Sequence, residues 1–426
     1  MDRDALMLPF PVIVVAVALL LLASLFSRRP ARPEAFNGGA VATGPTPQTR
    51  PAGPFSGPEE PVPRVGKEEG WWTCARQFAL ERRAIFTTHS LPLTHTSHFP
   101  SPGSYTTFTP SSLPIVLIKG RDANIRAFHN VCRHRAYTVA RKESGTSLVL
   151  GCRYHGWSYD ARGRLTKAPH FDALPGFRKE GMGLWPVGLS VLDGVVSVNF
   201  SGGERGESGK GRSEAELAAW AAAFADPSSR PVARFEAKGA FNWKLAVPPQ
   251  PAAAPISPLI RLISFLRPPH PDPEIYVFPL AHLAALPSGA WSMTVYNPLE
   301  PGKTEVRMDV YAPEGQGGDD AGLEAGFRAR VRELERNYAV LTAPGLPAGL
   351  KGIGRQDPQI AALLREHAAR ERRAGAEIFQ AAQQVPHEVG KGGEEVGNGV
   401  AEKVCRELES GVGGEGMCGR GPELEW

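Results

Sequence analysis

A long apolar run opens the chain. Residues 5–26 carry no charge, and Ser24 is the one polar side chain among them. A helix that spans a bilayer needs about 20 such residues, so the run predicts a membrane anchor over residues 1–29. Arg28 and Arg29 follow it, and positive residues favour the cytoplasmic side. The pattern predicts a single-pass membrane protein with its main domains in the cytoplasm. A cleaved secretory signal and an organelle-targeting segment are the alternatives.

Short strand-like segments come next. They begin near Trp71, after a stretch at residues 30–68 whose Pro, Gly and Thr content is typical of a disordered tether. The predicted strands cover residues 114–119, 124–128, 147–150, 157–159 and 187–200, the last interrupted by the turn pair Asp193 and Gly194. We therefore expect a small all-β domain at residues 69–200.

The second half of the chain mixes strand and helix patterns. Residues 304–311 alternate between polar and apolar, which is typical of a half-buried antiparallel strand. Further strands are predicted at residues 233–243, 275–278 and 291–296, and helices at residues 214–225, 321–338 and 358–384. This mix predicts an α+β fold. We expect a linker and helix at residues 201–232, a second domain at 233–387 and a disordered tail at 388–426.

Composition narrows the function classes. Lys and Arg number 48 and Asp and Glu 44, so the net charge of +4 gives no reason to expect nucleic acid as a partner. The five cysteines are sparse and odd in number, which argues against a disulfide framework and fits a reducing compartment.

Two short clusters carry the candidate chemistry. Cys132 and His134 form a C-x-H motif, and Cys152 and His155 form a C-x-x-H motif 17 residues further on. A Rieske [2Fe–2S] centre needs two Cys on one iron and two His on the other. A zinc site could use the same atoms, although zinc motifs usually pair like ligands. Ser158 and Tyr159 follow the second motif as possible hydrogen-bond donors to sulfur or as ordinary packing residues.

The stretches at residues 125–136 and 151–160 resemble the Rieske domain of ring-hydroxylating oxygenase α subunits, in the choline monooxygenase-like branch. The resemblance implies that Cys132 and Cys152 bind one iron and that His134 and His155 bind the other. It implies a helix-grip-like second domain and possible homotrimers. It also implies that a reductase or ferredoxin supplies electrons for O₂-dependent hydroxylation of choline, another quaternary amine or an aromatic substrate.

The resemblance further implies a mononuclear Fe(II) held by two His and one carboxylate, shortly after the Asn-Trp-Lys sequence at residues 242–244. Here a Pro- and Ala-rich stretch follows instead, and we find no matching His pair. The remaining candidates are scattered and match poorly: His270, His282, His367, His387 and Asp357. We therefore expect the iron ligands to be absent, through an error in the gene model or a real loss, and the catalytic residues stay unknown.

Two other functions stay open at this point. The chain would be a membrane-tethered electron-transfer protein without oxygenase activity if the mononuclear iron has been lost. It would be a zinc-stabilised binding domain if the Cys and His residues hold zinc. For an oxygenase acting on a quaternary amine, Trp291, Tyr296 and Tyr276 are weak candidates for an aromatic cage, and core packing is the competing role of each.

Overall fold

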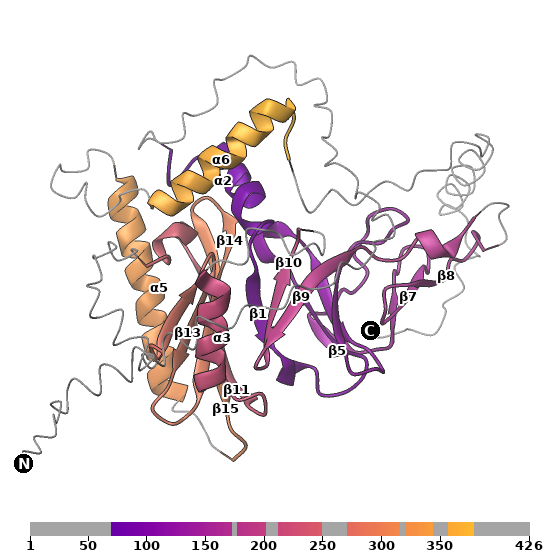
Figure 1. Cartoon of the computed structure of the whole chain (residues 1–426), viewed down its shortest axis with the longest axis horizontal. Helices are drawn as coiled ribbons and strands as arrows, with labels where there is room; N and C mark the ends of the chain where they lie inside the picture. The colour runs from indigo at the N-terminus through magenta and orange to yellow at the C-terminus, as the bar shows by residue number, and fades with distance from the viewer. Residues whose placement is uncertain are drawn as a thin grey trace, which may run out of the picture. The chain divides into compact units, whose positions relative to one another are not determined.

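The computed structural model describes residues 70–172, 177–201, 212–248, 271–315, 320–343 and 357–378 (Figure 1). The predicted anchor, tether and tail at residues 1–29, 30–68 and 388–426 lie outside the described residues. The predicted domain boundaries stay predictions.

A seven-stranded antiparallel sheet forms the first part of the fold. It contains β1 (Leu91–His95), β2 (Ser104–Phe108), β3 (Ile115–Lys119), β4 (Ile125–His129), β5 (Ser144–Thr146), β9 (Pro186–Leu192) and β10 (Val195–Asn199). The strand order is β1-β10-β9-β4-β3-β2-β5. The predicted turn at Asp193 and Gly194 is confirmed, because both residues have positive φ and they join β9 to β10.

A second, three-stranded sheet packs against the first. It contains β6 (Val149–Gly151), β7 (Ser158–Asp160) and β8 (Leu165–Lys167), and Phe128, Leu150 and Tyr159 share one apolar core between the two sheets. The loop after β4 holds the first Cys/His motif, and the loop between β6 and β7 holds the second. The fold therefore brings together two loops that belong to different sheets.

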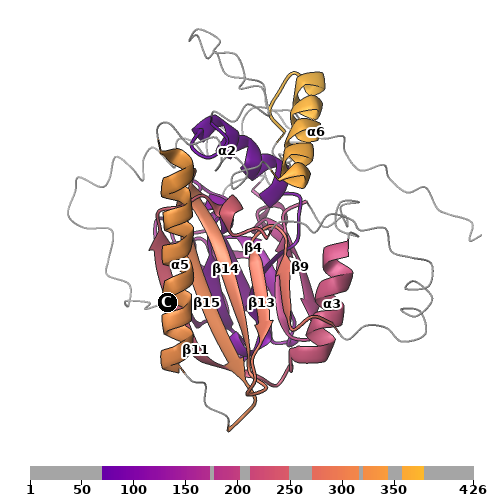
Figure 2. The ribbon, with the colours of Figure 1, turned by 90° about the vertical axis from the view of Figure 1, so that its left-hand side faces the viewer.

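A five-stranded antiparallel sheet forms the rest, in the order β11-β15-β14-β13-β12. Its strands are β11 (Arg230–Gly239), β12 (Glu274–Val277), β13 (Ala281–Ala285), β14 (Trp291–Glu300) and β15 (Lys303–Ala312). Helix α5 (Asp320–Thr342) lies beside β11 (Figure 2), and α3 (Arg212–Phe224) contacts β12. One apolar core joins this sheet to the first, since Leu91 and Val195 pack in the same cluster as Leu283 and Trp291.

The helices near the two ends of the described chain meet each other. Helix α2 (Ala75–Glu81) continues into a π-helical turn, η1 (Arg82–Phe86), and both contact α6 (Pro358–Ala374) (Figure 1). Asp357 caps the first turn of α6 by accepting the N–H groups of Gln359 and Ile360. The helix ends ten residues earlier than predicted, because Gly375 adopts the left-handed conformation that closes many helices.

The predicted membrane location is wrong. Among the residues that the structure describes, no helix is both long enough and apolar enough to cross a bilayer. The apolar run at residues 5–26, on which the prediction rested, lies outside those residues.

Candidate metal centre

The two motif loops share one backbone frame. In the first, the N–H of Cys132 donates to the carbonyl of Tyr137 and the N–H of Ala136 donates to the carbonyl of Cys132. In the second, residues 152, 156 and 157 repeat both bonds at nearly the same lengths, 2.8 and 2.9 Å. The fifth residue of each loop has positive φ, 57° at Ala136 and 70° at Gly156. Each loop therefore presents its Cys and His from an equivalent turn.

The turns place like atoms together. The thiols of Cys132 and Cys152 lie close enough for each to shift the pKa of the other, and the Nδ1 atoms of His134 and His155 lie 3.0 Å apart. Two nitrogens bound to one metal at about 2.0–2.1 Å would lie about 2.9–3.4 Å apart, depending on the angle. The two imidazoles are thus oriented as a pair of ligands to one ion, and the two thiols as a second pair.

A single structural zinc ion would need all four side chains around one point. In the described ranges, no three or more His, Cys, Asp or Glu side chains are arranged to hold one metal ion between them.

Burial and charge tune these side chains. Both cysteines are buried, whereas both histidines are only partly covered. The hydrogen bond from Cys152 lowers the pKa of Cys132 to about 6, and the same bond raises the pKa of Cys152. Burial, then the positive charges of His155 and Arg135, lowers the pKa of His134 to about 4. One thiolate and neutral imidazoles are therefore favoured near neutral pH, and these are ligand forms that metals bind.

Aromatic rings hold the histidine side of the centre. Trp157 stacks on the ring of His134 at a centroid distance of 5.0 Å, and Phe171 meets the same ring edge-on at 4.9 Å. These contacts restrict the rotation of the His134 ring and so fix the direction of its Nδ1 atom.

Tyr159 is the polar neighbour of the sulfur side. Its hydroxyl lies 3.3 Å from Cys132 Sγ and accepts the N–H of Arg133 at 3.1 Å. Tyr159 is thus a hydrogen-bond partner of the Cys132 sulfur, and either atom can be the donor. The Ser158 hydroxyl donates to the carbonyl of Gly156.

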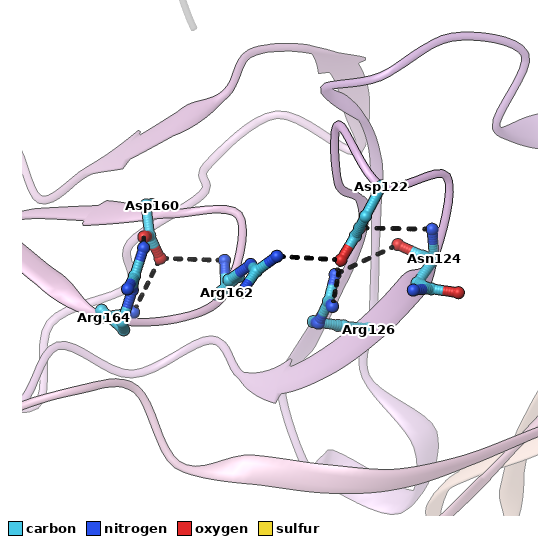
Figure 3. Close-up of polar contacts among 6 residues, drawn as sticks. All are labelled: Asp122, Asn124, Arg126, Asp160, Arg162 and Arg164. Atoms are coloured by element: carbon cyan, nitrogen blue, oxygen red, sulfur yellow. Dashed lines mark hydrogen bonds and ion pairs between the residues drawn. The ribbon is translucent and has the colours of Figure 1, made fainter.

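Exposed ion pairs join the turn between β3 and β4 to the turn between β7 and β8 (Figure 3). Asp122, in the turn between β3 and β4, accepts from Arg126 and also from Arg162 in the turn between β7 and β8. Asp160 accepts the backbone N–H of Arg162 and the side chain of Arg164. The hydrogen bond from Arg126 is the main cause that lowers the pKa of Asp122. The network connects the strands that precede the first loop to those that follow the second.

Comparison with known proteins shows which domain contains the two loops. The family model for the Rieske [2Fe-2S] domain matches residues 89–178, which include both loops. This part of the chain is similar to the corresponding part of the Rieske oxygenase α subunits.

Among these homologues, the glycine betaine monooxygenase oxygenase subunit of Chromohalobacter salexigens is 36% identical over 126 residues, which are 30% of this chain and 28% of that protein. The carnitine monooxygenase oxygenase subunit of Acinetobacter baumannii is 30% identical over 130 residues, 30% of this chain and 35% of that protein. The large oxygenase component of a naphthalene 1,2-dioxygenase system from Pseudomonas aeruginosa is 40% identical over 109 residues, 25% of this chain and 24% of that protein. The matched segments thus span at most about a third of these relatives.

The fold extends the likeness beyond the Rieske domain. The crystal structure of a quaternary ammonium Rieske monooxygenase in complex with L-carnitine superposes with a TM-score of 0.54 and 22% identity. The match covers 70% of this chain and 94% of the other. The Rieske β domain followed by a mixed sheet-and-helix domain is therefore the Rieske oxygenase fold.

The candidate ligands for a mononuclear iron are not brought together. His282 lies 3.5 Å from Glu274, His367 contacts Glu371 and the carbonyl of Ile378, and Asp357 caps α6. His270 and His387 lie outside the described residues, as does the whole of 249–270. The expected absence of this iron site stays a prediction.

The three residues considered for an aromatic cage have packing roles. Trp291 stacks on Tyr311 at 4.3 Å between ring centroids, the Tyr276 hydroxyl donates to the carbonyl of Pro279, and Tyr296 is buried.

A different cage surrounds a lysine of the chain itself. The ammonium of Lys244 lies 5.0 Å from the Trp71 ring centroid, 5.7 Å from that of Trp72 and 5.9 Å from that of Trp243. It also lies 2.5 Å from a carboxylate oxygen of Glu81. The adjacent Trp residues at 71–72 are visible in the sequence, but no sequence pattern connects them with Lys244.

Proposed function

We propose that this chain is a Rieske iron–sulfur oxidoreductase that passes single electrons from a reductase or ferredoxin toward O₂-dependent hydroxylation. The observation that carries the proposal is the pair of matched loops, which set two thiols side by side and two imidazole Nδ1 atoms 3.0 Å apart.

The side chains of the two loops would have separate roles in binding the cluster. Cys132 and Cys152 would hold one iron, and His134 and His155 would hold the other. A Rieske cluster, when bound, takes up and releases one electron, at a potential above that of clusters held by Cys alone. Trp157 fixes the His134 ring, and the Tyr159 hydroxyl, 3.3 Å from Cys132 Sγ, would donate to a Cys132 thiolate and offset the negative charge on that sulfur.

The substrate class we infer is a quaternary amine, with choline among the candidates. Relatives named for glycine betaine and carnitine oxidation support this class. An aromatic substrate is the alternative, supported by the naphthalene dioxygenase relative. The same proposal includes a reductase or ferredoxin as the electron donor and assembly of the chain as a homotrimer.

One sequence observation favours a second function, electron transfer without oxygenation. Residues 248–271 contain no Asp or Glu and a single histidine, His270. A facial triad of two His and a carboxylate therefore cannot be built from this segment alone. If the loss is real, the mononuclear Fe(II) expected in this family would be missing.

Metal analysis of the purified full-length protein tests these alternatives. We expect about two irons and two acid-labile sulfides per chain, and a Rieske-type electron spin resonance signal after reduction. His134→Ala or His155→Ala should abolish the signal, while His170→Ala, which changes an exposed histidine of the same domain, should preserve it. A colourless protein with one zinc would overturn the proposal. A count near three irons, with substrate-dependent O₂ uptake, would exclude the second function.

A further inference from the structure

A cavity lies at one end of the five-stranded sheet, apart from the two motif loops. Its volume is about 420 Å³, which is within the range of small-molecule sites. Its walls are Thr73 before α2, the end of β11, the turn that joins β14 to β15, and Tyr338 on α5. None of the residues that line it belongs to the segment 89–178 that matches the Rieske domain.

One buried side chain joins the walls of the cavity. Asn242 is 1% exposed, and its Nδ2 donates to the carbonyl of Trp72 at 3.0 Å and to that of Pro301 at 2.6 Å. The Tyr338 hydroxyl donates to the same Trp72 carbonyl at 3.4 Å. The segment at Thr73 is therefore held to the β14–β15 turn and to α5. The cavity is thus formed before any ligand binds, as is usual for small-molecule sites.

Two lysines line the cavity from neighbouring strands. Lys238 on β11 stands opposite Glu305 on β15, and Lys303 lies two residues before Glu305. Residues two apart on a strand point to the same face, so Lys238 and Lys303 are diagonal neighbours on that face. Diagonal neighbours are about 7–8 Å apart. Two positive charges at this spacing repel each other unless an anion lies between them.

The protein does not supply that anion. Within the described ranges, neither Lys238 nor Lys303 forms an ion pair or a side-chain hydrogen bond, and both are exposed. Arg234, further along the same face of β11, is by contrast paired with Asp309 at 2.6 Å and with Glu143 at 3.0 Å. Counter-charges are therefore present for the arginine of this face and missing for its two lysines.

The remaining polar groups of the cavity limit the charge of a ligand. Glu300 also lines the cavity, and Glu305 accepts from Asn297 at 3.3 Å; in the described part of the chain neither carboxylate forms an ion pair. Two ammonium groups and one carboxylate thus face the cavity. The hydroxyls of Thr73 and Tyr338 add hydrogen-bonding groups on the opposite walls. A small ligand with two negative charges matches this set, because each charge can pair with one lysine.

We propose that this cavity binds a small dianion whose acidic groups bridge Lys238 and Lys303. An organic dicarboxylate and a phosphate ester share this chemistry. The bound dianion would also contact Thr73 and so hold the segment before α2 against the five-stranded sheet. The site needs neither the iron–sulfur cluster nor a mononuclear iron, so it goes beyond the proposed oxidoreductase function and can fail separately from it.

Isothermal titration calorimetry of the full-length protein tests the site. The probes are succinate, a dicarboxylate, and glycerol 3-phosphate, a phosphate ester, with glycerol as the uncharged control. We expect one of the dianions to bind at one site per chain and glycerol not to bind. The dissociation constant should rise as NaCl increases from about 0.05 to about 0.5 M, because salt screens exposed charges. The dianion that binds should also raise the temperature of thermal unfolding.

Charge variants locate the binding. Lys238→Gln with Lys303→Gln should weaken binding by about tenfold, since each exposed charge contributes modestly. Glu300→Gln should strengthen binding, because it removes the carboxylate that repels the dianion. Lys142→Gln with Lys167→Gln is the matched control, an equal charge change at two exposed lysines of the Rieske domain. We expect it to leave the dissociation constant unchanged. Far-ultraviolet circular dichroism shows that each variant is folded.

The failures are distinguishable. No binding heat from either dianion at millimolar concentration would overturn the site, and so would an equal loss of affinity in the control pair, which would show a general charge effect. A protein that binds a dianion but contains no iron would refute the proposed function alone. A protein with a normal Rieske signal and no dianion binding would refute only the cavity site.

Discussion

The two motif loops differ at one residue where their geometry demands the same conformation. Gly156 adopts φ of 70° at little cost, whereas Ala136 adopts φ of 57° at the equivalent position. Left-handed backbone costs a residue with a Cβ about 1 kcal/mol. The first loop therefore carries conformational strain that the second avoids.

Ala136→Gly should relieve that strain. We expect the free energy of unfolding to rise by about 0.5–1 kcal/mol, because the gain in the folded loop exceeds the added freedom of glycine in the unfolded chain. Gly156→Ala should lower it by about 1 kcal/mol, and its new Cβ would also meet Pro169 Cγ at 3.2 Å. Urea unfolding of both variants checks the pair, and a destabilised Ala136→Gly protein would contradict the strain argument.

Candidate ligands that are close together in the sequence could be predicted at the residue scale. Each loop supplies one Cys and one His within four residues, so the candidate ligands could be predicted from spacing alone. The buried ion pair of Lys244 could not, because Glu81 is 163 residues away from that lysine. Only the tertiary fold brings the two together.

At the scale of elements, most of the strands were predicted, but β1 was missed. The alternating prediction at residues 304–311 falls within β15. Strand β1 was missed because it contains Pro92, and proline within a run argues against a strand except at the edge of a sheet; β1 is an edge strand.

The contact between η1 and α6 depends on a carboxylate. Glu371 accepts from Arg83 at 2.6 Å, from the N–H of Ile378 and from His367. Burial alone would raise the pKa of Glu371, but these hydrogen bonds, led by that of His367, lower it to about 2 from an ordinary 4.5.

Acid should therefore weaken this contact. A carboxyl whose folded pKa is depressed stabilises the fold fully above its unfolded pKa and loses that contribution as pH falls from about 4.5 to about 2. The shift corresponds to about 3 kcal/mol. Glu371→Gln should lower the free energy of unfolding by about that amount at neutral pH, with the difference from the unmodified protein shrinking as pH falls to about 2.

Denaturant unfolding at several pH values measures the difference. Glu366→Gln is the matched control on the same helix. Glu366 is exposed, and its ion pair with Arg370 is long, at 3.9 Å. We expect it to change stability little at any pH. A Glu371→Gln effect that did not vary with pH would rule out the carboxylate as its source.

At the scale of the whole molecule, a buried ion pair joins the start of the described chain to the second domain. Glu81 accepts from Lys244, from the Trp243 indole and from Gln77, and both charged side chains are at most 2% exposed. Three indole rings enclose the ammonium. Because both side chains are buried, water would not solvate either charge if its partner were removed.

Replacing one partner of this pair should lower the free energy of unfolding strongly, whereas replacing both should lower it much less. Lys244→Met should lower the free energy of unfolding by about 3–5 kcal/mol, because Glu81 is left as an uncompensated buried charge. Adding Glu81→Gln should recover most of the loss, since the amide still accepts from Trp243. Urea unfolding of the single and double variants gives the coupling energy. A double variant as unstable as Lys244→Met would show that the loss comes from packing and not from charge.

The hydrogen bond between Arg83 and Glu371 spans 288 residues of sequence. On the ribosome, where chains grow at about 5–20 residues per second, η1 must wait about 15–60 s after its own synthesis before its partner exists. During that interval Arg83 and the apolar side chains beside it are available to chaperones or to aggregation. The rate of synthesis therefore sets the earliest time at which this contact between the two ends of the folded region can form.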